Sequence, residues 1–165
     1  MKKMMYMFGF IVISITINSC SSDNAEENGK TTPPIEEVGY TYSDSELETM
    51  KVINEYRVSI GLNTLIASSV ISVECQNHNK YMIANKVVNH DDFEVRYKNI
   101  VKALKAKSVA ENVAYNYKEG EGVLKAWLES PGHKENLDGD YTHFGLSVTT
   151  DSAGKKYYTN IFAKI

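Results

Sequence analysis

The spacing of apolar residues changes along the chain, and this change limits the fold more than any other feature of the sequence. Between residues 44 and 104, apolar residues recur every three or four positions, which is the spacing of helices with one face in a core. Near the C-terminus, residues 144–150 and 156–163 alternate between apolar and polar around a turn at 151–154, as expected of a β-hairpin. Helices followed by adjacent antiparallel strands are typical of the α+β class. We therefore predict an α+β fold in which helices cover a small antiparallel sheet.

Four helices and one further strand can be placed from local signals. Residues 43–46 (Ser-Asp-Ser-Glu) have the form of a capping box, so the first helix is expected to begin there and to end before Gly61. Cys75 lies on the apolar face of the second helix, which predicts a small buried residue. The predicted helices cover residues 44–58, 68–85, 93–104 and 120–130, and the predicted strand covers residues 111–117.

The composition fits a single globular domain. The chain has 165 residues, of which 42% are hydrophobic and 24% charged, enough for one domain with a core. Its 18 Lys and Arg and 21 Asp and Glu give a net charge of −3, so we expect no nucleic-acid partner. Two cysteines, Cys20 and Cys75, are too few for a disulfide framework.

The N-terminus has the pattern of a signal peptide. Lys2 and Lys3 precede an apolar run over residues 4–17, which is short for a bilayer span of about 20 residues. The sequence Ile-Asn-Ser-Cys that ends at Cys20 resembles the lipobox of bacterial lipoproteins. The resemblance implies cleavage after residue 19 and attachment of diacylglycerol and a further acyl chain, such as palmitate, to Cys20. The alternative is an ordinary secreted protein in which Cys20 is incidental.

This pattern divides the chain into three parts. We expect a lipoprotein signal peptide over residues 1–19, a lipidated cysteine and flexible tether over 20–42, and a folded domain over 43–165. The lipid anchor would make the membrane a partner of the chain. The domain would then stand in the cell envelope outside the cytoplasm, on the outer membrane or the cell surface.

Several clusters of residues occur in an order that resembles the CAP superfamily, the domain of cysteine-rich secretory proteins, antigen 5 and pathogenesis-related 1 proteins. The bacterial, disulfide-free branch is most similar, with motifs of the form N-x-x-R, A-x-x-H, H-x-x-F-x-x-R, G-E-N and A-W-x-x-S-P-G-H. The matching segments are residues 54–57, 75–78, 90–96, 110–114 and 126–133. The resemblance covers nearly all of the predicted domain and implies an α-β-α sandwich.

The same resemblance implies a site in a central cleft. Many members carry two histidines and two glutamates there, and the matching positions are His90, Glu111 and His133. The second glutamate has no clean match, because Ser130 stands at its position and Glu129 lies one place earlier.

Two interpretations of these three residues remain open. Two imidazoles and a carboxylate would suit a divalent ion such as zinc, with a coordination position left for water or ligand. Alternatively, His90, Glu111 and His133 form a hydrogen-bonded cluster that ties separate elements together, because buried polar groups need partners.

Two functions follow from these interpretations. The first is a binding module that holds a small molecule, lipid or peptide in the cleft. The second is a protease-like hydrolase whose water is activated by a metal or by Glu111, since neither a His-Glu-x-x-His helix nor a Gly-x-Ser-x-Gly elbow occurs. A pair of Ser130 and His133 is a further catalytic alternative.

Overall fold

The structure is a computed structural model that describes residues 35–36 and 39–165. The chain divides into two units, residues 1–30 and 31–165, and the described residues all lie in the second. The predicted signal peptide, Cys20 and most of the predicted tether therefore fall outside the described residues. The elements in order are β1 (Ile35–Glu36), α1 (Asp44–Ser59), β2 (Ile66–Ser68), α2 (Ser69–Asn85), α3 (Phe93–Leu104), β3 (Ser108–Tyr115), α4 (Gly120–Glu129), α5 (Pro131–Asp138), β4 (His143–Thr150) and β5 (Lys156–Lys164).

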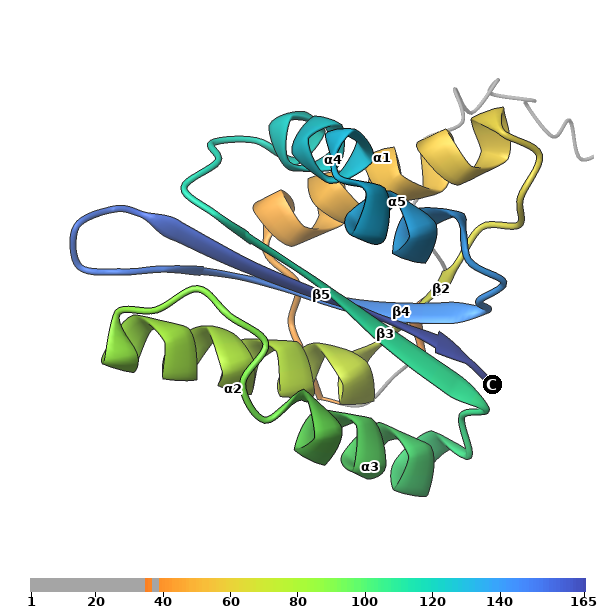
Figure 1. The fold of residues 1–165 in the computed structure, drawn as a ribbon, viewed down its shortest axis with the longest axis horizontal. Helices are drawn as coiled ribbons and strands as arrows, with labels where there is room; N and C mark the ends of the chain where they lie inside the picture. Colours follow the sequence, from red (N-terminus) through yellow and green to blue (C-terminus); the bar gives the residue numbers. More distant parts are fainter. Residues whose placement is uncertain (1–34, 37–38) are drawn as a thin grey trace, which may run out of the picture. The chain divides into compact units, whose positions relative to one another are not determined.

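Five strands form one sheet in the order β1-β2-β4-β5-β3. The hairpin of β4 and β5 is antiparallel, and β3 pairs antiparallel with β5, while the short β1 and β2 join in parallel. Figure 1 shows α1, α4 and α5 on one face of the sheet and α2 and α3 on the other. The α+β class and the predicted α-β-α sandwich are confirmed, and the sheet gains two parallel strands at one side.

Each face of the sheet carries its own core. Phe144, Leu146 and Tyr158 meet α1, α4 and α5, and Trp127 of α4 is buried among them. On the other face, Ile71, Cys75, Ile100 and Ile161 form a second cluster with α2 and α3. Cys75 is fully buried, as predicted, and burial raises the pKa of its thiol well above the usual value. No helix in the described part of the chain is long and apolar enough to cross a membrane.

The capping box of α1 also attaches this helix to the sheet. Ser43 and Glu46 form the predicted box, in which the Ser43 side chain accepts from the Glu46 backbone and the Glu46 side chain accepts from the Ser43 backbone. The buried Glu46 carboxylate accepts two more hydrogen bonds, from the backbone N–H of Val148 at 2.9 Å and from the Tyr40 hydroxyl at 2.8 Å. Tyr40, like β1, thus belongs to the packed domain although both lie before residue 43.

Two residues of the N-x-x-R motif hold the other end of α1. Asn54 pairs with both backbone groups of Leu65, at 2.8 and 3.0 Å, and so places the chain that enters β2. Arg57 is fully buried, and its Nη1 donates to the carbonyls of Leu137 and Gly139 at 2.7 and 2.9 Å. A buried guanidinium stays satisfied only with such acceptors, so this motif is structural.

Local signals located most element boundaries, with three differences. The strand predicted over residues 111–117 is β3 and begins earlier, at Ser108. A further helix, α5, follows α4 and was not predicted. Ser130 is extended between the two helices, and Pro131 occupies the first turn of α5. The three-residue β2 is too short to show a period in the sequence.

Gly145 allows α2 to pack directly on β4. A Cβ atom at this position would lie 2.5 Å from the Ser72 backbone nitrogen and 2.6 Å from the Ile71 carbonyl carbon. Both neighbours belong to the backbone of a buried helix, so the contact cannot relax by rotation of a side chain.

We predict that Gly145→Ala lowers the free energy of unfolding by about 1–3 kcal/mol, because overpacking separates α2 from the sheet. Urea unfolding followed by circular dichroism would measure the change. Gly132→Ala in α5 is the matched control, since nothing lies within 4 Å of the added Cβ there. Equal stability of the two variants would contradict the close approach.

Candidate functional site

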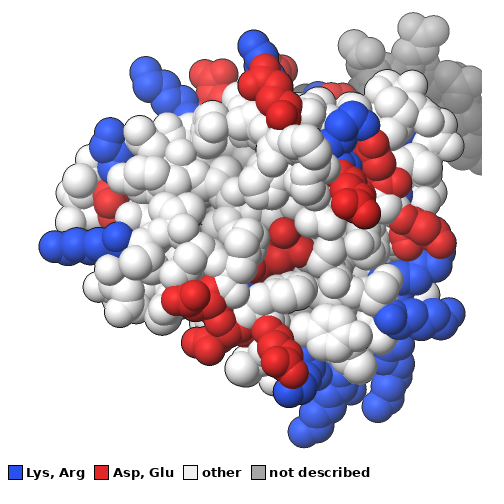
Figure 2. All heavy atoms as spheres, in the orientation of Figure 1, with Lys and Arg blue, Asp and Glu red and all other residues white. Residues whose placement is uncertain are grey.

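The candidate site lies at the free edge of β3, which pairs only with β5 in the described sheet. Successive residues of β3 face opposite layers. Glu111 and Val113 face α2 and α3, whereas Asn112 and Ala114 face α1, α4 and α5. The site therefore has one half on each side of the sheet. In the view of Figure 2, the middle of the molecular surface is largely uncharged apart from an acidic patch, and basic side chains gather over α3.

Glu111 is the centre of the first half. Its side chain is buried, and Arg96 of α3 donates to both carboxylate oxygens, from Nε at 2.7 Å and from Nη2 at 2.8 Å. His90, in the loop before α3, lies with its Nδ1 2.8 Å from Oε1 of the same carboxylate. Arg96 also donates from Nη1 to the carbonyl of Asp91 at 2.7 Å. One guanidinium thus fixes the carboxylate and the loop that carries His90.

The charge of Glu111 is stabilised by its partners. Burial by itself raises the pKa of the Glu111 carboxyl, but the hydrogen bonds from His90 and Arg96 and the positive charge of Arg96 together bring it below its ordinary value. Glu111 is therefore an ionised carboxylate at neutral pH, and all its strong donors come from the protein.

His78 of α2 supports the same loop. The ring is buried, and its Nε2 lies 2.9 Å from the carbonyl of Asn89, so Nε2 carries the proton and donates. Burial lowers the pKa of His78, which keeps the imidazole neutral. His78 is the structural histidine that its place on the apolar face of the helix predicts.

His133 belongs to the other half of the site. It lies in the first turn of α5, where its backbone carbonyl accepts from Asn112 Nδ2 at 3.0 Å and its ring lies 6.5 Å from the Trp127 ring. Burial, with a smaller contribution from the charge of His90, lowers the pKa of His133. Within the described part of the chain, no hydrogen bond joins the His133 side chain to His90 or Glu111.

The structure thus brings His90 and Glu111 into direct contact and places His133 as a neighbour across the edge of β3. Among the described residues, no group of three His, Cys, Asp or Glu side chains is placed to hold a metal ion. Arg96 occupies the position beside Glu111 where a cation would have to lie. The residues present do not fit a zinc site with three ligands. Of the expected cluster, His90 and Glu111 are hydrogen-bonded, together with Arg96, whereas the His133 side chain is not part of it. Glu129, the weak match to the fourth family residue, is exposed at the end of α4.

The free edge of β3 is capped by side chains from α4 and α5. Trp127 Nε1 donates to the Val113 carbonyl at 3.0 Å, and Asn136 Nδ2 donates to the Glu111 carbonyl at 3.2 Å. Asn136 also donates to Oδ1 of Asn112 at 2.9 Å. The Trp and Asn of these two helices therefore satisfy carbonyls that β5 cannot reach.

A groove lies beside His133. It has a volume of about 250 Å³ and is lined mainly by Tyr115, Tyr117, Ala126, Trp127, Ser130 and His133. Tyr115 and Tyr117 are large exposed aromatic residues, at 38% and 37% exposure. No hydrogen bond joins Ser130 to His133 in the described structure, so the two residues line the groove without forming a nucleophile–base pair.

Sequence reasoning missed Arg96 as a site residue, although it belongs to the quoted H-x-x-F-x-x-R motif. The motif itself was a signal, because an arginine on a helix next to a strand that carries a glutamate can supply the partner that a buried carboxylate requires. The groove has a weaker signal: tyrosines such as Tyr115 and Tyr117 could line a groove, but their alternation along the chain fits packing within a sheet equally well.

Comparisons with known proteins agree with this architecture. The family model described as the cysteine-rich secretory protein family (CAP) matches residues 50–162. A membrane protein of Bacillus subtilis, named as uncharacterized, is 32% identical over 126 residues, which are 73% of this chain and 34% of that protein. The chain therefore spans about a third of the length of this relative.

Solved structures with the same fold come from several bacteria. An outer surface protein of Borrelia burgdorferi has a TM-score of 0.63 at 23% identity, over 77% of this chain and 98% of that one. A cysteine-rich secretory protein of Staphylococcus aureus has a TM-score of 0.62 at 25% identity, over 73% and 38%. An extracellular protein of Bacillus anthracis that contains an SCP domain has a TM-score of 0.63 at 23% identity, over 78% and 45%.

We predict that Glu111→Gln lowers the free energy of unfolding by about 3 kcal/mol at neutral pH, because Arg96 then stays buried without a counter-charge. Since the native pKa of Glu111 lies below its unfolded value, its contribution is complete above about pH 4.3 and is lost as the pH falls through the native pKa.

Denaturant unfolding of both proteins across this pH range would measure the effect. The stability difference should be constant near neutral pH and should shrink in acid. The matched control is Glu94→Gln, which removes a glutamate paired with Lys98 on the exposed face of α3. A difference that persists unchanged in acid would show that the charge of Glu111 is not the cause.

Proposed function

The chain belongs to the cysteine-rich secretory protein (CAP) family, and on that premise we propose that it is an extracytoplasmic binding module. Its ligand would be a small molecule with an apolar or aromatic body and one polar group, held in the groove beside His133. The outer surface, extracellular and membrane proteins to which the chain is similar support a place outside the cytoplasm.

One observation carries the choice of binding over hydrolysis: both oxygens of Glu111 are engaged by Arg96, and one of them also by His90. A general base must accept a proton from a bound water, and it works best with a pKa near the operating pH. Glu111 has a lowered pKa, and each of its two oxygens already accepts a hydrogen bond from Arg96. The His/Glu pair is therefore better suited to hold the shape of the site than to activate water.

The groove offers what a small ligand needs. Tyr115, Tyr117 and Trp127 provide aromatic surface, while Ser130 and the neutral imidazole of His133 provide hydrogen bonds at one end. A volume of about 250 Å³ lies near the lower limit of ligand sites, so one ring or a short aliphatic segment fits better than a whole lipid.

The proposal includes a lipid anchor at Cys20, supported by the lipobox-like sequence that follows the apolar run. Diacylglycerol together with a further acyl chain would hold the protein stably at the membrane, because three acyl chains exceed the marginal affinity of one. The folded domain would then face the exterior or the periplasm.

We expect the full chain to bind indole, a neutral aromatic probe, with changes in NMR signals from Tyr115, Tyr117 and His133. Ala126→Leu should abolish this binding, because the larger side chain fills the groove from the partly exposed face of α4. Val95→Leu, on exposed α3 away from the groove, is a control of similar chemistry.

A casein-cleavage assay on the same proteins separates the two functions. The binding module should show no activity above a chain unfolded by heat. Cleavage that disappears in Glu111→Gln while the fold is retained would overturn the assignment in favour of the hydrolase.

For the anchor, we predict that Cys20 carries acyl chains in the mature protein. Intact-mass spectrometry of the membrane-extracted protein should show a chain that begins at Cys20 with added diacylglycerol mass. Cys20→Ala should block both lipid attachment and removal of the signal peptide, whereas Cys75→Ala should leave the lipid mass unchanged. An unmodified Cys20 in the membrane-extracted protein would refute the anchor.

A further inference from the structure

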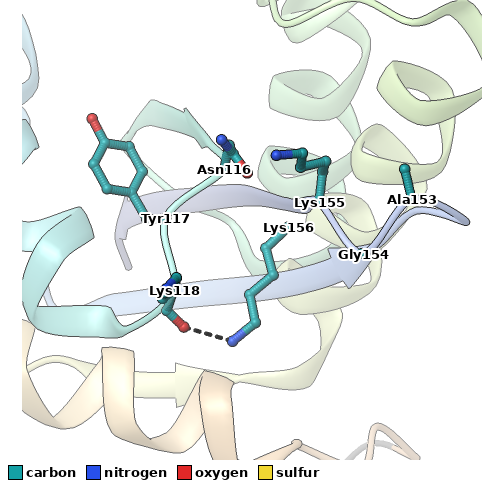
Figure 3. A pocket seen from close by; sticks show the side chains of 7 residues that line it. All are labelled: Asn116, Tyr117, Lys118, Ala153, Gly154, Lys155 and Lys156. Carbon is teal, nitrogen blue, oxygen red and sulfur yellow. Dashed lines mark hydrogen bonds between the residues drawn. The ribbon is translucent and has the colours of Figure 1, made fainter.

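A second cavity shares Tyr117 with the groove. It has a volume of about 360 Å³ and lies between residues 116–118, which follow β3, and residues 153–156, which form the turn into β5. Figure 3 shows three lysines around it, Lys118, Lys155 and Lys156, with the Lys155 side chain directed towards Asn116. None of the residues that the CAP resemblance singles out lines this cavity.

The lysines of this cavity lack acidic partners. Lys156 Nζ donates to the carbonyl of Lys118 at 2.7 Å and to the hydroxyl of Ser45 at 2.8 Å, both of which are uncharged acceptors. Lys118 and Lys155 form no ion pair with any residue in the described ranges. Four other lysines are paired with carboxylates: Lys51 with Glu55, Lys98 with Glu94, Lys134 with Asp138 and Lys164 with Asp140. Three lysines thus line one cavity, and among the described residues none of them has a carboxylate partner.

The acidic residue in the turn beside the cavity, Asp151, is already engaged. The Asp151 carboxylate accepts from the backbone N–H of Ala153 at 2.9 Å and of Lys155 at 2.8 Å. These bonds hold the turn, in which Gly154 has a φ of +76°. Asp151 therefore shapes the cavity wall rather than neutralising the lysines.

Both walls of the cavity are held in place before any ligand binds. The backbone N–H of Asn116 donates to the carbonyl of Lys156 at 2.7 Å, and Asn116 has a left-handed φ of 64° that turns the chain away from β3. The Lys156 side chain links this loop to the start of β5, as the dashed line in Figure 3 marks. A ligand would meet a preformed frame and would order only the two free lysines.

We propose that this cavity is a binding site for an oxyanion, such as the phosphate or carboxylate of a larger molecule, separate from the His90–Glu111 site. Lys118 and Lys155 supply the charge, because an ammonium binds oxyanions as a compact point charge with three donors. Lys156 positions the loop between them.

The test is an NMR titration of the isotope-labelled full chain in non-ionic detergent with inorganic phosphate, at constant ionic strength. Saturable shifts of the backbone amides of Lys118, Gly154 and Lys155 are expected. The double variant Lys118→Gln/Lys155→Gln should bind phosphate about tenfold more weakly, as two charged donors are lost. Both side chains are exposed, so the double variant should unfold at the same temperature as the native chain.

The matched control is Lys98→Gln/Lys102→Gln, which removes the same charge from the exposed face of α3. It should bind phosphate as the native chain does. Shifts that rise linearly without saturation, equal affinity in the Lys118/Lys155 variant, or an equal loss in the α3 control would each overturn the proposal.

A parallel titration with glycerophosphoglycerol, the soluble headgroup of phosphatidylglycerol, identifies the source of the anion. Tighter binding of this phosphodiester than of inorganic phosphate supports a site for a lipid headgroup. Tighter binding of inorganic phosphate supports a site for a soluble phosphorylated ligand. Failure of both probes overturns the site, and this result would leave the indole groove beside His133 untouched.

Discussion

The buried ion pair between Arg96 and Glu111 determines the arrangement of the whole site. Two charges taken out of water persist only when each has its partner and further hydrogen bonds satisfy the rest. Arg96 meets this condition with Glu111 on β3 and the carbonyl of Asp91 before α3. A single side chain therefore links a helix, an edge strand and the loop that carries His90.

This arrangement changes what the CAP residues can do in this chain. A carboxylate held by a guanidinium is a poor ligand for a second cation and a poor acceptor for a proton from water. His133 stays uncharged near neutrality and faces an aromatic groove rather than the carboxylate. These residues are therefore better suited to bind a ligand than to cleave a bond. Tyr117 lines both the groove and the lysine cavity, so the two proposed binding sites share one residue but differ in chemistry.

The sequence alone predicts those elements whose formation depends on residues close together along the chain. The capping box at Ser43 and the helical spacing that follows predict α1 because both depend on residues a turn apart. α5 was missed because its position depends on distant partners, among them Arg57, which donates to the carbonyls of Leu137 and Gly139 at the C-terminal end of this helix. His90 and Glu111 were placed by family resemblance, but the pair of Glu111 with Arg96 joins residues 15 positions apart and appears only after folding. The groove arises from three elements and has no linear pattern.

The capped edge of β3 has a consequence for self-association. An uncovered edge strand is a template on which another chain can add a strand, the first step towards fibrils. Trp127 and Asn136 occupy two of the acceptors that such a strand would need, and β1 at the opposite edge contains only two residues. A protein displayed at high density on a surface would gain from this, because crowded neighbours would find no strand to extend. Trp127 would then help to prevent association at the edge of β3, in addition to packing in the core.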